Sequence, residues 1–295
     1  MTDPFDAHRR EEHLEVVNGV ELFFEDTGPV GAPAVLYLHG GPGYNSFSFQ
    51  DLAGEFLTGY RVVYLDQRAT GRSGLVDSDP ALFTIDALVG DALAVMSELG
   101  IESFTPVGHA FGAVLALECA RVAPTRVPRV VVVNPWLHFP ELASGLYESA
   151  WALSGNAGRP TPPEAPEERA NAAFALLGGR NLLAELHFPT AASRMRLEFS
   201  DAASGLMASG EAQEGFLVNG LWELEYPAYL AEVRAQTTVI VGTLDATSYP
   251  SQTDWLVDLA AARLLTLEAG HYPWVDDVEA FAGALLSSLP PLESN

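Results

Sequence analysis

The chain has 295 residues, 48% of them hydrophobic, and carries 15 Lys and Arg against 39 Asp and Glu, for a formal net charge of −24. This length is enough for one large domain, or one domain with a sizeable insertion, around a well-buried core. The negative charge repels phosphate backbones and anionic lipid surfaces, so nucleic acids and membranes are not expected partners.

The amino-terminal stretch and the single cysteine indicate the compartment. The sequence MTDPFDAHRREEH is polar, and no run approaches the ~20 apolar residues that span a bilayer. Cys119 alone forms no intramolecular disulfide and no thiolate metal site. We therefore expect a cytoplasmic protein with no metal and no other cofactor.

The first predicted elements are the strands of an α/β sheet. Two β-rich runs in residues 13–28 flank Asn18-Gly19, a strong hairpin signal, so the chain should begin with an antiparallel pair. Short, nearly continuous apolar runs follow, as is typical of parallel strands buried on both faces; they cover residues 34–41, 61–67, 104–109, 127–135, 237–245 and 262–271. Helical patterns lie between them, for example at 84–100, and predict a mostly parallel sheet with helices on both faces.

The strand signal is lost between about Trp136 and about Arg234. Alanine, leucine and glutamate dominate this interval, which includes a proline-rich, charged loop, GRPTPPEAPEERA. We interpret it as a helical cap inserted into one α/β domain. The predicted division is residues 1–135 for the first half of the core, 136–235 for the cap and 236–295 for the second half.

Two glycine motifs follow predicted strands, at the edge where open α/β sheets place their ligands. In HGGPG, residues 39–43, consecutive glycines let backbone N–H groups point into a cleft and stabilise an oxyanion; a plain turn is the alternative. The second motif, VGHAFGAVLA at 107–116, has the spacing of a strained G-x-S-x-G turn with Ala110 at the centre. Such strain costs about 1–3 kcal/mol, so Ala110 resembles a truncated nucleophile; filler in an ordinary turn is the alternative.

An acid and a histidine follow two later strands. Asp245 comes after TTVIVG, and His271 comes after RLLTLEAG. Either side chain alone could be structural. Position 110, then an acid, then a histidine is the chain order of the α/β-hydrolase triad, so together they predict one catalytic site.

Five motifs together resemble the α/β-hydrolase fold and, within it, the proline iminopeptidase family: HGGPG, DQRATGRSG, VGHAFGAVLAL, GTLDATSYP and AGHYPWVDD. The resemblance covers roughly residues 15–135 and 237–290. It implies a serine nucleophile at position 110, His271 as general base and then acid, and Asp245 orienting the imidazole. It also implies an oxyanion hole formed by the backbone N–H groups of Gly41 and Phe111.

The cap shows less resemblance. Members of the family release an N-terminal proline from short peptides and bind its amine with cap carboxylates. The candidates here are Glu214 in QEGFLVNG, where Gln213 takes the expected register, and Glu185 in LLAELHF. Exposed helix-face charges are the alternative for both. Trp274, close behind His271, is expected to line the site.

The resemblance predicts a serine hydrolase that releases an N-terminal residue, with proline preferred, through an acyl-enzyme. Its partner would be a small peptide or amino-acid derivative with a free amino terminus, and no oligomeric state is predicted. With Ala110 the chain is expected to be nearly inactive, whether through an engineered Ser→Ala change or through natural loss of the nucleophile. The retained glycines and His–Asp pair favour the first. A non-catalytic ligand-binding protein and a carboxylesterase are the alternatives.

Overall fold

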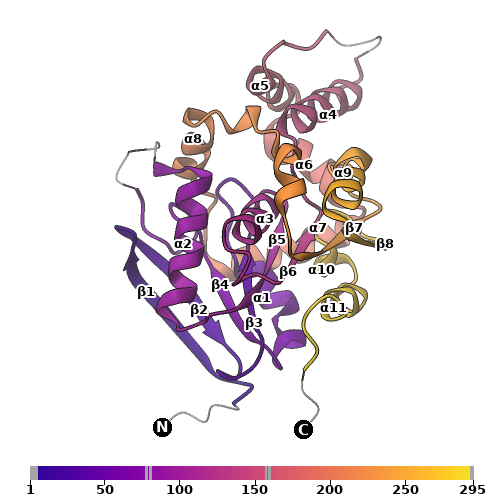
Figure 1. Cartoon of the computed structure of the whole chain (residues 1–295). Coiled ribbons are helices and arrows are strands. Elements are labelled where there is room, and N and C mark those ends of the chain that lie inside the picture. The colour runs from indigo at the N-terminus through magenta and orange to yellow at the C-terminus, as the bar shows by residue number, and fades with distance from the viewer. Residues whose placement is uncertain (1–5, 77–78, 80–81, 157, 159–160, 293–295) are drawn as a thin grey trace.

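The computed structural model describes all residues except 1–5, 77–78, 80–81, 157, 159–160 and 293–295. The described residues form an eight-stranded sheet of order β1-β2-β4-β3-β5-β6-β7-β8 (Figure 1). Its strands are β1 (Arg10–Val17), β2 (Val20–Thr27), β3 (Ala34–Leu38), β4 (Arg61–Leu65), β5 (Phe104–His109), β6 (Arg129–Val133), β7 (Gln236–Gly242) and β8 (Arg263–Leu267). The first two strands are antiparallel to their neighbours, and the pairs from β4 to β8 are parallel. The predicted α/β-hydrolase fold with an amino-terminal hairpin is confirmed.

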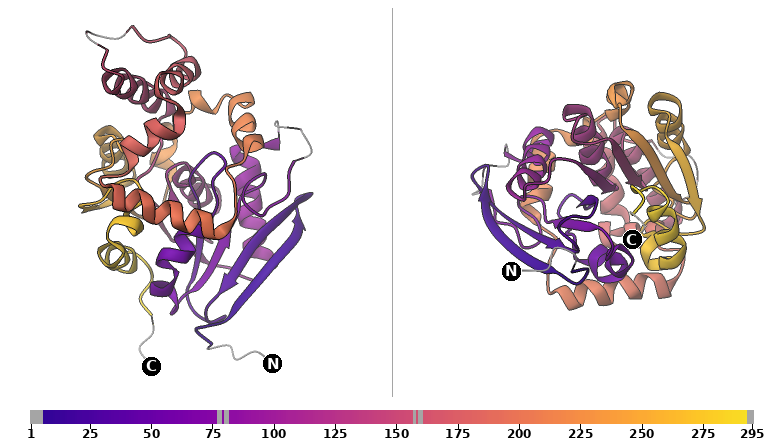
Figure 2. Two further views of the ribbon diagram at one scale, coloured as in Figure 1. Left: turned by 180° about the vertical axis from the view of Figure 1, so that it is seen from behind. Right: turned by 60° about the horizontal axis from the view of Figure 1, so that its bottom comes forward.

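Helices cover both faces of the twisted sheet (Figure 2). They are α1 (Phe47–Ala53), η1 (Gly54–Leu57), α2 (Ile85–Glu98), α3 (Gly112–Val122), α9 (Pro250–Ala260), α10 (Pro273–Asp276) and α11 (Val278–Leu286). Side chains alternate along each strand, so Leu36 packs in the core beneath α2 and α3, while Tyr37 packs with α1 and α11 on the other face. Burial on both faces explains why the strands read as continuous apolar runs.

The predicted start and end of α2 are confirmed. The Thr84 side chain caps the helix by accepting a hydrogen bond from the Ala87 backbone N–H at 3.1 Å. Gly100, just beyond the helix, has φ +67, a left-handed conformation that favours glycine.

Between β6 and β7 the described residues form helices. These are α4 (Phe139–Leu153), α5 (Pro166–Leu177), α6 (Gly179–His187), α7 (Ala191–Ser204), α8 (Gly210–Val218), η3 (Leu221–Glu223) and η4 (Tyr226–Glu232). In Figure 1, α4 and α5 lie at the end of the molecule farthest from both termini. The division of the chain at 136 and 235 into core and cap stays a prediction.

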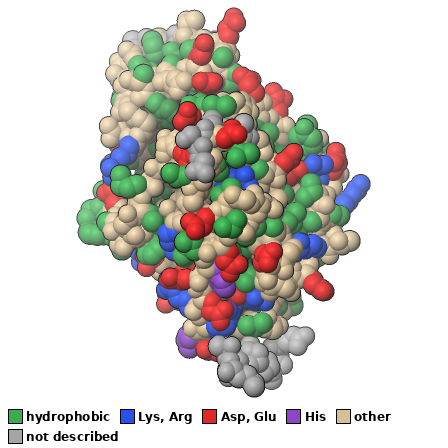
Figure 3. Space-filling model, turned by 90° about the vertical axis from the view of Figure 1, so that its left-hand side faces the viewer, with side chains coloured by type: hydrophobic (Ala, Val, Ile, Leu, Met, Phe, Trp, Pro, Cys, Tyr) green, Lys and Arg blue, Asp and Glu red, His purple; other side chains and the backbone are tan. Residues whose placement is uncertain are grey.

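Acidic side chains are spread over the face of the molecule seen in Figure 3 and do not gather in one patch. None of the helices in the described part of the chain combines the length and the apolar character that a membrane span requires.

Candidate active site

The predicted acid and histidine meet beyond the carboxyl ends of the parallel strands. His271 Nδ1 lies 2.8 Å from Asp245 Oδ2, and both side chains are buried. Burial lowers the pKa of His271 to about 3 and raises the pKa of Asp245. The imidazole is therefore neutral near pH 7, and its Nδ1–H donates to the carboxylate. With Nδ1 engaged, the lone pair of Nε2 is left to take up a proton.

Thr247 fixes the orientation of the acid. Asp245 Oδ1 accepts hydrogen bonds from the Thr247 backbone N–H at 2.8 Å and from its Oγ1 at 2.7 Å, which directs Oδ2 to the imidazole. Trp136 Nε1 donates to Thr247 Oγ1 at 3.3 Å. Sequence reasoning missed Thr247, although an Asp followed two residues later by a backbone donor is a recognisable turn pattern.

Ala110 occupies the strained turn that its flanking glycines predict. Its φ is +49, it is 1% exposed, and its backbone is held by hydrogen bonds to Val133 and Trp136. A Cβ at Gly108 would lie 2.2 Å from the Gly112 carbonyl oxygen, so this crossing of strand and helix requires glycine. The turn has the geometry that presents a nucleophile, but the methyl group of alanine offers no lone pair.

The glycine loop packs directly against this turn. A Cβ at Gly40 would lie 3.1 Å from the Ala110 Cβ, and Gly41 has φ +141, which favours glycine. Among the described residues we find no hydrogen-bond acceptor for the backbone N–H of Gly41 or of Phe111. Both amides are therefore free to donate to an oxyanion, as the proposed oxyanion hole requires.

Buried hydrogen bonds connect the DQRATGRSG segment to the glycine loop and to the residues that follow it. Asp66 accepts hydrogen bonds from the Ser46 backbone N–H and Oγ and from Arg72 Nε, at 2.7–2.8 Å. Gln67 Nε2 donates to the His39 carbonyl oxygen at 2.8 Å. The DQRATGRSG motif therefore has a structural part in the site.

Comparison with known proteins identifies the family. Residues 33–275 match the model of the α/β hydrolase fold family. The chain belongs to that family. A crystal structure of a proline iminopeptidase-related protein from Thermus thermophilus is 40% identical with a TM-score of 0.87, over 97% of this chain and 100% of that one.

Curated relatives match over shorter stretches. A probable proline iminopeptidase of Streptomyces coelicolor is 38% identical over 127 residues, 41% of this chain and 38% of that protein. A putative carbamate hydrolase RutD of Enterobacter cloacae is 35% identical over 107 residues, 36% of this chain and 39% of that protein. The chain thus spans about two-fifths of the length of these relatives. Their names suggest different activities, so the comparisons support a hydrolase and leave its substrate to be proposed.

Asn134 ties two loops of this α/β hydrolase together, and sequence reasoning missed it. It follows β6 with φ +42 and is completely buried. Its Nδ2 donates to the carbonyl oxygens of Gly270 and His271 at 3.0 and 2.9 Å, and its Oδ1 accepts from the Gly242 backbone N–H at 2.8 Å. Asparagine adopts the left-handed region more readily than most residues, which explains why it fits this position directly after β6.

The carboxyl end of α6 contacts the two segments that carry Asp245 and His271. The Leu186 carbonyl oxygen accepts from the Ala246 backbone N–H at 3.0 Å, and that of His187 accepts from the His271 backbone N–H at 2.9 Å. The His187 ring stacks on the His271 ring, with centroids 4.0 Å apart and planes at 16°. His187, two residues after the predicted Glu185, is therefore a side chain of α6 that contacts His271.

The three residues predicted to bind substrate do not contact the His271 and Asp245 side chains. Glu185 on α6 and Glu214 on α8 are exposed, while His187 and Phe216 on the same helices are buried. Exposure favours the alternative interpretation of both carboxylates, as charges on a solvated helix face. Trp274 is a core residue: it is fully buried against Phe49. It makes edge contacts with His109 and Tyr272, with centroids 4.8 and 5.6 Å apart.

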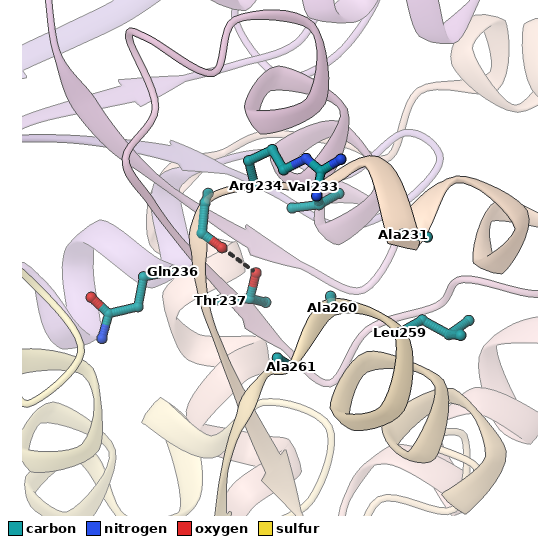
Figure 4. Close-up of a pocket in the computed structure, with 9 residues that line it drawn as sticks. Ala231, Val233, Arg234, Gln236, Thr237, Leu259, Ala260 and Ala261 are labelled. Carbon is teal, nitrogen blue, oxygen red and sulfur yellow. Dashed lines mark hydrogen bonds between the residues drawn. The ribbon is translucent and has the colours of Figure 1, made fainter.

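Figure 4 shows a separate pocket of about 350 Å³, whose lining includes Gln236 and Thr237 at the start of β7. Asp245 follows the other end of that strand. The pocket is lined by Ala231, Val233, Arg234, Ala235, Gln236, Thr237, Leu259, Ala260 and Ala261. Arg234 is the charged residue of this lining, and none of the triad positions contributes to it. The described residues contain no group of three or more His, Cys, Asp or Glu arranged to hold a metal ion.

Proposed function

We propose that this site is that of a serine hydrolase of the proline iminopeptidase type, in which Ala110 stands where the nucleophile acts. The observation that carries the proposal is the 2.8 Å His271–Asp245 hydrogen bond. The strained residue at position 110 is linked to this pair through Trp136, whose backbone N–H donates to the Ala110 carbonyl oxygen and whose ring stacks on the His271 ring. The substrate would be a short peptide or amino-acid amide with a free amino terminus. The names of the similar proteins and the acidic charge, which favours a cationic substrate, support this class.

With serine at position 110 each group has a defined role. His271 Nε2 takes the proton of Oγ as Oγ attacks the scissile carbonyl carbon. The tetrahedral oxyanion accepts hydrogen bonds from the Gly41 and Phe111 amides. His271 then gives the proton to the leaving amine as the scissile C–N bond breaks. Water next attacks the acyl carbon as His271 takes up its proton, and His271 returns that proton to Oγ as the acid product leaves. The methyl group of Ala110 cannot begin this sequence, so the chain binds substrate without turnover.

The test is the Ala110→Ser protein, assayed on prolyl-, alanyl- and leucyl-p-nitroanilide beside p-nitrophenyl acetate and butyrate. We expect prolyl anilide to be cleaved fastest, at least ~10⁴-fold faster than by the Ala110 chain. Ala110→Gly, which keeps the turn and adds no hydroxyl, is the matched control and should remain inactive. Turnover of the esters alone would replace the peptidase with a carboxylesterase. A folded Ala110→Ser protein that turns over no substrate, and whose introduced serine is not labelled by a fluorophosphonate, would overturn the proposal.

A second candidate is a ligand-binding protein with a hydrolase fold and no catalytic activity. Ala110 itself favours it, because the chain lacks a nucleophile at the strained turn. Reading the codon at position 110 in the source genome decides between the two candidates. A serine codon there removes the second.

A further inference from the structure

His187 is held in the site by its backbone and by its ring. As the last residue of α6 it receives the His271 backbone N–H on its carbonyl oxygen at 2.9 Å, and its ring stacks on the His271 ring at 4.0 Å. The residue as a whole is 4% exposed. A Cβ at Gly270 would lie 2.2 Å from the same carbonyl oxygen, so glycine before His271 allows this approach. The cap therefore places one imidazole firmly beside the catalytic one.

The Nε2 of His187 is buried and has no hydrogen-bond partner among the described residues. Around the ring stand the aromatic rings of Trp136, Phe188 and Tyr272, at centroid distances of 6.0, 6.4 and 5.8 Å. Buried polar atoms in folded proteins are nearly always paired, and an unpaired one is costly. A polar group of a bound ligand would satisfy this nitrogen.

The position of His187 defines which part of a substrate it meets. His271 uses Nδ1 for Asp245, so its other nitrogen serves the reacting atoms. The centroids of the His187 and His271 rings are 4.0 Å apart. From this separation we infer that a group bound to His187 lies about one residue from the scissile carbonyl. In an amino-terminal residue, the polar group at that distance is the α-amine.

The protonation state of His187 suits an amine. Burial first, and then the neighbouring His271, hold the pKa of His187 well below its ordinary value. The ring is thus neutral and can accept a hydrogen bond from an ammonium group. The carboxylates expected for this task, Glu185 and Glu214, are exposed.

We propose that His187 recognises the α-ammonium group of the substrate by accepting a hydrogen bond at Nε2, which makes it a specificity-determining residue of the cap. This assignment rests on the proposed function, since it presumes a substrate with a free amino terminus. It also explains why an acidic residue is not needed at this position.

The experiment measures binding of L-prolinamide and N-acetyl-L-prolinamide to the Ala110 chain by calorimetry, which needs no turnover. His187→Phe keeps a flat ring and removes the nitrogen, and we expect it to weaken L-prolinamide binding roughly tenfold to hundredfold. Binding of the acetylated probe, which has no ammonium group, should change less than about twofold. His187→Gln, which offers an amide near the Nε2 position, should recover part of the loss. Glu168→Gln, an exposed carboxylate of α5, is the matched control, and Glu185→Gln and Glu214→Gln test the carboxylate alternative.

The outcomes separate this inference from the proposed function. Unchanged L-prolinamide affinity in His187→Phe, or equal losses for both probes, overturns the role of His187 and leaves the proposed function standing. Failure of the parent chain to bind L-prolinamide overturns both. If His187→Phe does not fold, imidazole ¹⁵N NMR of the parent protein decides the question. The His187 Nε2 resonance should shift with L-prolinamide and stay in place with the acetylated probe, and a resonance unmoved by either refutes the contact.

Discussion

The Asn134→Ala substitution tests how much the three buried hydrogen bonds of Asn134, next to His271, contribute to stability. The change removes three hydrogen bonds. The Gly242 N–H and the Gly270 carbonyl oxygen lose their Asn134 partner. The His271 carbonyl oxygen still accepts a hydrogen bond from His109 Nε2 at 2.9 Å. Each unpaired buried group costs about 1–3 kcal/mol. Alanine also tolerates φ +42 less well than asparagine. We therefore expect the free energy of unfolding to fall by about 3–5 kcal/mol.

Equilibrium urea unfolding followed by tryptophan fluorescence measures this loss. Asn134→Asp keeps the size but turns an oxygen toward two carbonyl oxygens, so it should destabilise the protein at least as much. Asn181→Ala, at an exposed asparagine of α6, is the matched control and should stay within about 0.5 kcal/mol of the parent. A loss below about 1 kcal/mol for Asn134→Ala would refute the reasoning, because the loops would then be held by other contacts.

Changes at the acid, at the buried histidines and in the glycine loop test other parts of the site. In the Ala110→Ser protein, Asp245→Asn should lower kcat about 10⁴-fold, measured on the best anilide, because an amide favours the wrong imidazole tautomer; a loss below about tenfold would contradict this. Burial lowers the pKa of His109 and His187 in the folded protein. Below pH 6.5 the unfolded state therefore binds more protons than the folded state, and the free energy of unfolding decreases as the pH is lowered. The urea midpoint should therefore fall between pH 6.5 and pH 5, and a midpoint that does not change over that range would exclude this linkage. Gly43→Ala should cost about 2 kcal/mol or more, because φ is +89 and the added Cβ would lie 2.6 Å from a carbonyl oxygen of the loop before α8; an unchanged melting temperature would argue against that contact.

The elements that the sequence predicted well are those whose signal is local. Continuous apolar runs mark strands buried on both faces, and Asn18-Gly19 adopts the positive φ values, +51 and +81, that its hairpin needs. Gly108 and Gly112 mark the turn at Ala110 because each glycine is required by a contact with nearby backbone. The acid and the histidine could be found because each directly follows a predicted strand.

The residues that escaped prediction depend on contacts between distant segments. His187 and Asn134 act on His271 from 84 and 137 positions away in the chain, and neither belongs to a recognisable motif. The cap helices were expected to present carboxylates, but helix periodicity does not tell which face of α6 meets the core when both faces carry polar residues. Glu185 and His187 differ by two positions, which places them on different sides of the helix.

Backbone strain at position 110 does not by itself identify a lost nucleophile. Glycine there would relieve about 1–2 kcal/mol of left-handed strain, but it would lose about 0.8 kcal/mol from the buried methyl group and about 0.5–1 kcal/mol of chain entropy. Alanine and glycine are therefore close in stability at this turn. The His271–Asp245 pair is different, because burying an imidazole and a carboxylate carries a large desolvation cost that apolar residues of similar volume would avoid. The presence of this costly pair, and not the strain at Ala110, is therefore the stronger argument that the site is built for chemistry.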